Sequence, residues 1–209
     1  MPGYRLSSRH IRRSLARVAA EHVEVQRALD LVGYPTERRR PEGFETLLRI
    51  IVGQQVSVAA ATAIASRLED ALKGEVSAAK LLRVRETTLQ RAGLSRPKIR
   101  YARALARSVR SGQLDFEEIA ALPDAEVMTR IQAVPGLGPW SAQIYLMFSL
   151  GRPDIWPQDD VGALRGLQKM ARLAERPTPR EGAERVACMS PHRSAVALLA
   201  WRCANATAL

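Results

Sequence analysis

The chain has 209 residues, of which 46% are hydrophobic and 25% are charged, a composition typical of a folded globular protein. No apolar run reaches the roughly 18 residues that a membrane-spanning helix requires. The N-terminal segment is basic but lacks the apolar core of a secretory signal. We therefore expect a cytoplasmic protein, associated with the nucleoid if its source is bacterial, that has no membrane partner.

The formal net charge of +11 indicates a polyanionic partner, most often nucleic acid. Charge alone does not choose between DNA, RNA and a membrane surface, and an Arg-rich composition without functional meaning is an alternative. Two cysteines, Cys188 and Cys203, cannot build a disulfide scaffold, a four-thiolate zinc site or an iron–sulfur cluster. We expect two buried thiols and no required cofactor.

The apolar residues recur at helical spacing along nearly the whole chain. The first clear helical face is formed by Phe44, Leu47, Leu48 and Ile51. A second helix is predicted from Ser57 to just before Gly74, and a third from Ser95 to Gly112. Further helices are predicted to start at Asp115, Asp124, Thr178 and Ser190. No convincing period-2 run occurs, so we predict an all-α fold of about nine or ten helices joined by short turns.

The most loop-like segment is "GYPTERRRPEG", residues 33–43, which separates an N-terminal helix from a compact middle block. We predict one functional unit over residues 1–209, made of two helical lobes. Residues 41–135 form the middle lobe, and residues 1–32 with 136–209 form the second. A ligand cleft between the lobes would be a natural consequence.

Two short motifs follow each other in the C-terminal half. In "IQAVPGLGPWSAQ", Gly136 and Gly138 permit a tight turn with positive φ before a helix that starts at Pro139. The amides at such a helix start can bind a phosphate, although a purely structural turn is the commoner case. In "QDDVGALRGL", Asp159 or Asp160 precedes a short helix, where an acid is most often an N-cap.

Taken together, the Pro-Gly-x-Gly turn, the aromatic Trp140, the apolar helix and the acid pair resemble the helix-hairpin-helix DNA glycosylase superfamily. The resemblance is closest to its alkylated-base branch, the 3-methyladenine DNA glycosylase II type, in the short form without the N-terminal mixed α/β domain. Three other segments also match that branch: "IVGQQVSVAAA" (51–61), "AGLSRPKIRYARALA" (92–106) and "PHRSAVALLAW" (191–201). The resemblance covers roughly residues 40–205.

The resemblance implies that Asp160, the second acid of the pair, is the catalytic residue, with Asp159 as its neighbour. Cleaving an N-glycosidic bond builds positive charge on the deoxyribose, and a carboxylate can stabilise that charge or orient the attacking water. Lyase-type relatives carry a lysine at the position of Trp140, where it forms a Schiff base. Since tryptophan has no amine, we expect a monofunctional glycosylase that uses water.

By the same resemblance, Trp140 and Trp201 form a base pocket in which a flipped, cationic alkylated purine would stack. The alternative is that both are core residues. Ile144 and Val161 replace usually aromatic residues in this pocket, which affects the range of lesions. Gln55 corresponds to the residue that fills the gap left by the flipped nucleotide, although it is also explained as a polar residue at a helix end.

The resemblance also assigns the hairpin residues Gly136, Leu137 and Gly138 to a DNA phosphate. Backbone carbonyls at Gln132, Val134 and Gly136 are expected to hold a monovalent cation, Na⁺ or K⁺, as a structural element. No side chain is required for either role.

The expected function is excision of 3-methyl and 7-methyl purines from double-stranded DNA in base excision repair, by a monomer. One alternative is a glycosylase of the same fold that acts on uracil, hypoxanthine or etheno-adducts. Another is a helix-hairpin-helix module that binds DNA without catalysis, which would not need a carboxylate at Asp160. RNA-binding and membrane-surface roles have no supporting motif.

Overall fold

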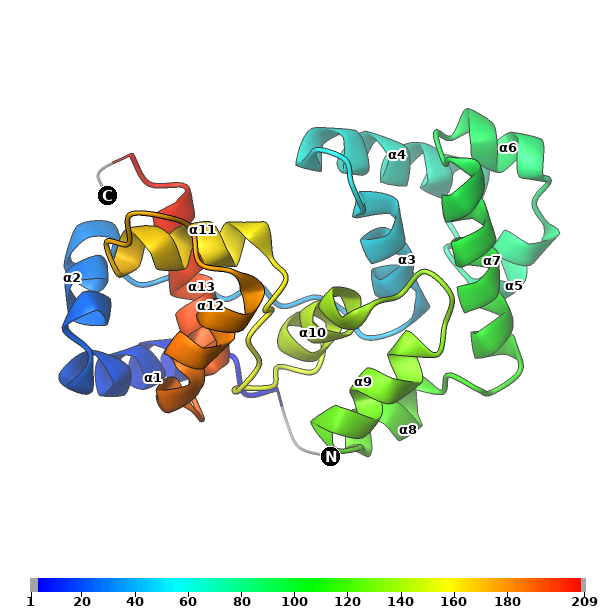
Figure 1. The fold of residues 1–209 in the computed structure, drawn as a ribbon. Coiled ribbons are helices and arrows are strands. Elements are labelled where there is room, and N and C mark those ends of the chain that lie inside the picture. Colours follow the sequence, from blue (N-terminus) through cyan, green and yellow to red (C-terminus); the bar gives the residue numbers. More distant parts are fainter. Residues whose placement is uncertain (1–3, 208–209) are drawn as a thin grey trace. The chain divides into compact units, whose positions relative to one another are not determined.

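The computed structural model describes residues 4–207, and in this part of the chain it contains thirteen α-helices, one short 3₁₀-helix and no β-strand (Figure 1). The predicted all-α class is confirmed. There are more helices than the about nine or ten that periodicity predicted, because some are too short to show a repeat. Two of them, α5 (Ala78–Arg83) and α6 (Glu86–Arg91), have only six residues each. The N-terminal segment also divides into two helices at His22, whose backbone is extended.

The chain forms two compact units. The first, Arg40–Tyr145, contains α3 (Phe44–Gly53), α4 (Val58–Ala71), α5, α6, α7 (Arg96–Arg110), α8 (Phe116–Ala121), α9 (Asp124–Gln132) and most of α10 (Pro139–Phe148). The second consists of residues 4–39 and 146–207 of the described chain. It contains α1 (Ser8–Glu21), α2 (Val23–Val32), α11 (Val161–Met170), α12 (Pro179–Val186), η1 (Ala187–Met189) and α13 (Arg193–Ala204).

The first unit is built around α3 and α7, which pack against each other. The predicted apolar face of α3 is confirmed, since Leu47, Leu48 and Ile51 are almost fully buried. Several predicted helix starts are also confirmed by their caps. The side chains of Ser57, Asp115 and Thr178 each accept hydrogen bonds from first-turn amides of the helix that follows.

The second unit is built around α11 and α13, which cross at very close range. A Cβ added to Gly166 would lie 1.7 Å from the carbonyl oxygen of Ala200, so only glycine permits this crossing. The sequence had predicted that the last helix begins at Ser190, but in the structure it begins at Arg193. The Ser190 hydroxyl instead donates a hydrogen bond to Asp154, 2.7 Å away, so it is not available as a cap.

The turn after α9 belongs to the first unit in the structure, whereas the sequence-based division assigned residues 136–209 to the second lobe. The turn and α10 contact the first unit directly. Gln54 Nε2 donates to the carbonyl of Gly136 at 2.8 Å, and the backbone amide of Gly43 donates to the Tyr145 hydroxyl at 3.0 Å. The latter contact lies beside Phe116, whose ring centroid is 6.1 Å from that of Tyr145.

Two further predictions concern burial. Cys203 is buried, and burial raises the pKa of its thiol to about 11. Cys188 is exposed, so the expectation of two buried thiols is wrong for this residue, which lies in η1 at the surface of the second unit.

Within residues 4–207, none of the helices is both long enough and apolar enough to span a membrane.

Candidate functional site

The turn between α9 and α10 depends on one of its two glycines. Gly136 has φ of 90°, and a Cβ there would lie 2.2 Å from the Tyr101 ring. Both the backbone and the space therefore require glycine. Gly138 has no left-handed φ and no atom within 4 Å of an added Cβ, so the prediction of positive φ was wrong for this residue. It precedes Pro139, which favours an extended backbone.

The middle residue of the turn, Leu137, is buried, with 3% of its surface exposed. Its backbone amide donates to the carbonyl of Val134 at 3.0 Å, which closes the turn. The Leu137 side chain therefore anchors the hairpin, and any contact with a ligand falls to the backbone and to Gly138. The Gly138 carbonyl accepts from the amide of Ala142 at 3.2 Å and so begins the hydrogen bonds of α10.

A cavity of about 540 Å³ lies against this turn within the first unit. It is lined by the hairpin, by Gln54 and Gln55 of the loop between α3 and α4, and by Lys98 and Tyr101 of α7. Lys98 Nζ donates to the carbonyl of Val52 at 2.7 Å, and desolvation lowers the pKa of this amine. One concave surface therefore combines a lysine with the backbone of the hairpin, and both kinds of group can bind an anion.

Gln55 lies at the exposed tip of the α3–α4 loop with φ of 55°, a conformation that residues other than glycine adopt infrequently. The residues on its N-terminal side hold it there. Gln54 is hydrogen-bonded to the hairpin, and Lys98 ties down the C-terminal turn of α3. Gln54 and Lys98 both lie in segments that carry the family resemblance, but no spacing pattern in the sequence indicates that they anchor this loop.

The three residues whose carbonyls are predicted to hold a cation, Gln132, Val134 and Gly136, line the same cavity. The carbonyls of Val134 and Gly136 each accept one hydrogen bond, from Leu137 and Gln54, and a carbonyl has a second lone pair that can take a cation. These two carbonyls can therefore accept a further ligand, and the monovalent cation stays a prediction. Among the described residues, no three His, Cys, Asp or Glu side chains are grouped so as to hold a metal ion.

Trp140 is half-buried at the start of α10. It lines a second cavity of the first unit, about 460 Å³, together with residues of α3 and α4 that include Ile50 and Ala61. Ile144, one turn further along, is only 4% exposed and belongs to the core. Tyr145 is fully buried, and burial raises the pKa of its hydroxyl.

In the second unit, Asp160 is the N-cap of α11. Its Oδ1 accepts a hydrogen bond from the backbone amide of Ala163 at 2.7 Å and another from Trp201 Nε1 at 2.8 Å. Asp159 is exposed and does not cap the helix. The capping and functional interpretations of Asp160 are therefore compatible, because one carboxylate is fixed by a helix start and by an indole.

Trp201 is half-buried on α13 and packs against Phe148, with ring centroids 5.7 Å apart. The guanidinium of Arg38 lies 5.9 Å from the indole centroid. A Cβ on Gly162 would lie 3.1 Å from both the indole and Asp160 Oδ1, so glycine lets the two groups meet. Val161, which follows Asp160, is 60% exposed and thus available at the surface beside the carboxylate.

The structure thus brings the predicted site residues together in two groups. The first unit groups Gln55 and the hairpin around one cavity and places Trp140 at the start of the next helix. The second unit joins Asp160 directly to Trp201. One group offers backbone amides and a cationic side chain, and the other offers an oriented carboxylate beside an aromatic surface.

Residues 48–190 match the family described as HhH-GPD superfamily base excision DNA repair protein. Because this match covers more than half of the chain, the chain belongs to that family, and the resemblance found in the sequence is confirmed. The chain is also 30% identical over 183 residues to DNA-3-methyladenine glycosylase 1 of Schizosaccharomyces pombe, across 85% of this chain and 80% of that protein.

Two solved structures are similar over almost the whole chain. One is a 3-methyladenine DNA glycosylase from Schizosaccharomyces pombe in complex with abasic DNA, with a TM-score of 0.88 and 26% identity over 94% of this chain and 98% of that one. The other is a DNA-3-methyladenine glycosidase from Bacillus halodurans, with a TM-score of 0.81 and 30% identity over 92% and 89% of the two chains.

Proposed function

We propose that this chain is a monofunctional DNA glycosylase that excises 3-methyl and 7-methyl purines from double-stranded DNA in base excision repair. The observation that carries the proposal is the Asp160 carboxylate, which is hydrogen-bonded to the first turn of α11 and to Trp201. The names of the relatives from Schizosaccharomyces pombe and Bacillus halodurans support the same substrate class.

In the proposed reaction, the bond between the deoxyribose carbon and the base nitrogen breaks, and the base leaves with the bonding electrons. Positive charge builds on the sugar, and the Asp160 carboxylate stabilises it and orients the attacking water. The water oxygen then bonds to the sugar carbon, the Asp160 carboxylate takes up the proton that the water loses, and an abasic site remains. An alkylated purine is already cationic, so it leaves readily without a strong acid. Trp140 supplies no amine, so no Schiff base forms.

The first unit supplies DNA binding in this proposal. The hairpin amides contact a backbone phosphate, and a Na⁺ or K⁺ ion on the carbonyls of Gln132, Val134 and Gly136 would add positive charge there. Gln55, exposed at its loop tip, enters the gap that the flipped nucleotide leaves. The net charge of +11 attracts duplex DNA without regard to sequence. We propose that the protein acts as a monomer in the cytoplasm, at the nucleoid if its source is bacterial.

The flipped base would stack on Trp140 and Trp201, where the electron-rich indole faces attract a cationic ring. The second candidate function, action on uncharged lesions such as hypoxanthine or etheno-adducts, is favoured by one observation. Val161 is aliphatic and 60% exposed beside Asp160, at a position that the resemblance fills with an aromatic residue. Fewer aromatic walls weaken the preference for a cationic base.

Incubation of the protein with methylated duplex DNA, followed by chromatography of the released bases, tests the proposal. We expect release of 3-methyladenine and 7-methylguanine by the native protein and its loss in Asp160→Asn, which keeps a capping side chain. Asp159→Asn, at the exposed neighbour, is the matched control and should stay active. Absence of release by the native protein, or full activity of Asp160→Asn, would rule the proposal out. Borohydride trapping of the native protein on DNA would contradict the monofunctional assignment.

A further inference from the structure

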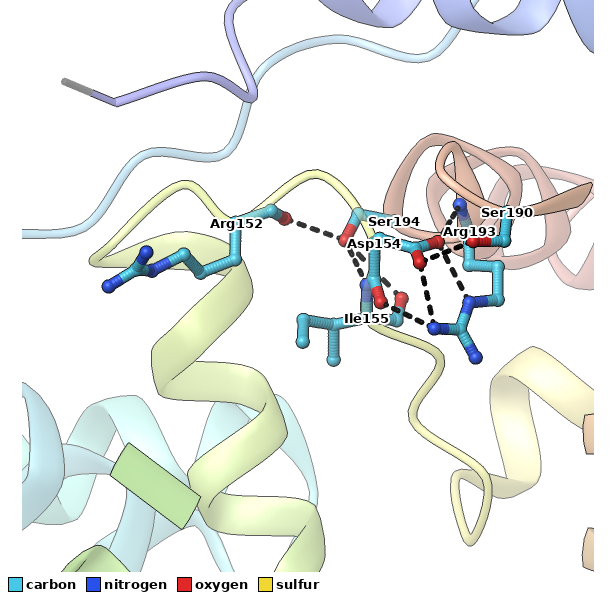
Figure 2. A network of polar contacts seen from close by, with 6 residues as sticks. All are labelled: Arg152, Asp154, Ile155, Ser190, Arg193 and Ser194. Atoms are coloured by element: carbon cyan, nitrogen blue, oxygen red, sulfur yellow. Dashed lines mark hydrogen bonds and ion pairs between the residues drawn. The ribbon is translucent and has the colours of Figure 1, made fainter. Parts of the chain in front are cut away.

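The loop that leads to Asp160 is joined to the start of α13 by a partly buried salt bridge between Asp154 and Arg193 (Figure 2). Asp154 Oδ1 accepts from Arg193 Nε at 2.8 Å and from the Arg193 backbone amide at 3.2 Å. Arg193 Nη2 donates to Asp154 Oδ2 at 2.8 Å and to the Asp154 carbonyl at 3.1 Å. Ser190 donates to Asp154 Oδ2 at 2.7 Å. The Arg193 guanidinium thus binds both the side chain and the backbone carbonyl of Asp154.

Ser194 holds the two ends of the same short turn. Its hydroxyl donates to the carbonyl of Arg152 at 2.7 Å and accepts from the amide of Ile155 at 2.9 Å, while its own amide donates to the carbonyl of Pro153 at 3.1 Å. Figure 2 shows the serine between these loop residues. Residues 152–155 are therefore fixed to the first turn of α13 by side chains and by the backbone.

The segment between Asp154 and Asp160 is fixed at both ends to one helix. Arg193 binds its beginning, and Trp201, two turns further along α13 and roughly 12 Å away, binds its end through Asp160. Ile155, Trp156 and Pro157 between these ends are buried. The position of the Asp160 carboxylate relative to the Trp201 indole is thus determined by how this segment lies along α13.

We infer that Arg193 and Asp154 are positioning residues for Asp160, which they hold in register with Trp201 through the buried segment between them. This inference rests on the proposed function, in which Asp160 must face the sugar. Catalytic groups lose efficiency steeply when they are displaced by about 1 Å. Loosening the Asp154 end therefore lowers the rate of excision, although neither residue contacts the substrate.

The first test is single-turnover excision from methylated DNA with enzyme in excess. We expect Arg193→Gln and Asp154→Asn to lower the rate constant about 10- to 100-fold, with DNA affinity changed less than about twofold. Arg193→Lys should recover part of the loss, since lysine keeps the charge but not the two-pronged grip. Arg180→Gln is the matched control, because it removes the same charge from an exposed helix surface, where Arg180 pairs with Glu184. It should retain the native rate.

The second test is independent of activity. The chain has three tryptophans, so its indole N–H signals are resolved in a ¹H–¹⁵N spectrum and assigned with Trp→Phe variants. We expect Arg193→Gln, or Arg193→Lys if the glutamine variant does not fold, to shift the Trp201 signal, which reports the hydrogen bond to Asp160. The Trp140 signal of the other unit should stay in place.

The combined outcomes separate the inference from the proposed function. A native protein without excision activity would contradict the proposed function, while the Trp201 signal would still report whether Arg193 acts on Asp160. If excision falls while the Trp201 signal is unchanged, Arg193 acts only through general stability, and the inference is wrong. Native-like excision in Arg193→Gln would overturn it as well.

Discussion

The hairpin of the first unit and the carboxylate site of the second are constructed in opposite ways. The hairpin exposes backbone groups, and its side chains serve to shape it. Leu137 is buried, and Gly136 makes room for Tyr101. The carboxylate site exposes a side chain and uses backbone and side-chain donors to orient it. Since a phosphate is bound by amides and a developing sugar cation by a carboxylate, binding and chemistry should respond separately to substitution.

The largest expected effect is on chemistry alone. Asp160→Asn should lower the single-turnover excision rate about 10²- to 10³-fold, as loss of one preorganised charged group does elsewhere. Its affinity for methylated DNA should stay close to native, because asparagine can still accept the amide of Ala163 and cap α11. The measurement is the rate constant beside a fluorescence-anisotropy titration. A parallel loss of affinity would show that Asp160 acts in binding and would remove the distinction between the two regions.

The converse is expected for the hairpin, where two glycines form a matched pair. Gly136→Ala places a methyl group against the Tyr101 ring with a left-handed backbone, at a cost of roughly 2–4 kcal/mol. Affinity for DNA should fall at least tenfold, while the excision rate at saturating enzyme is largely kept. Gly138→Ala meets nothing within 4 Å and should behave nearly as the native protein. Equal effects of the two substitutions on affinity would contradict the assigned turn geometry.

These two regions differ in how much the sequence could reveal. The helical class, the caps and the hairpin follow from local rules, since Ser57, Asp115 and Thr178 act on amides only two or three residues away. Even there, the local rules predicted positive φ at both glycines of the turn, whereas only Gly136 has it and Gly138 does not. The prediction that Asp160 is catalytic came from the order of several motifs and not from its own surroundings in the chain.

Contacts between distant residues could not be predicted in the same way. Trp201 was expected as a pocket wall, and its hydrogen bond to Asp160 depends on how α13 packs against α11. Arg193 and Lys98 each bind a segment more than thirty residues away in sequence. The spacing of residues in the sequence does not predict such contacts, because they depend on the packing of the whole unit. For the same reason the exposure of Cys188 was missed.

The salt bridge between Asp154 and Arg193 should make the second unit sensitive to acid. Burial alone would raise the pKa of the Asp154 carboxyl, but hydrogen bonds from Arg193 and Ser190 outweigh it and lower the pKa below its ordinary value of 3.8. The ionised group therefore stabilises the fold above about pH 4, and this contribution is lost as the pH falls through the lower folded pKa.

Asp154→Asn tests that sensitivity. At pH 7 it should reduce the free energy of unfolding by about 2 kcal/mol, the usual worth of hydrogen bonds to a charged group. The difference from the native protein should shrink in urea titrations below about pH 4, because Asp154 takes up a proton in the unfolded chain there and in the folded protein only at lower pH. Glu118→Gln, at an exposed pair with Arg130, is the control and should show a small difference at every pH. A difference of constant size from pH 7 to pH 3 would show that the charge of Asp154 does not stabilise the unit.

The smallest effect is expected at Lys98, one of the two residues that hold the α3–α4 loop in place. Lys98→Met removes the hydrogen bond to the Val52 carbonyl and so loosens the α3–α4 loop that carries Gln55, at a cost of about 1 kcal/mol. DNA affinity should fall about fivefold, with the excision rate at saturating enzyme unchanged. Lys80→Met, which removes the same charge from a surface pair with Glu75, separates loss of the anchor from loss of charge. If both variants weaken binding equally and lose the same salt dependence, Lys98 contributes only its charge, and the loop does not depend on it.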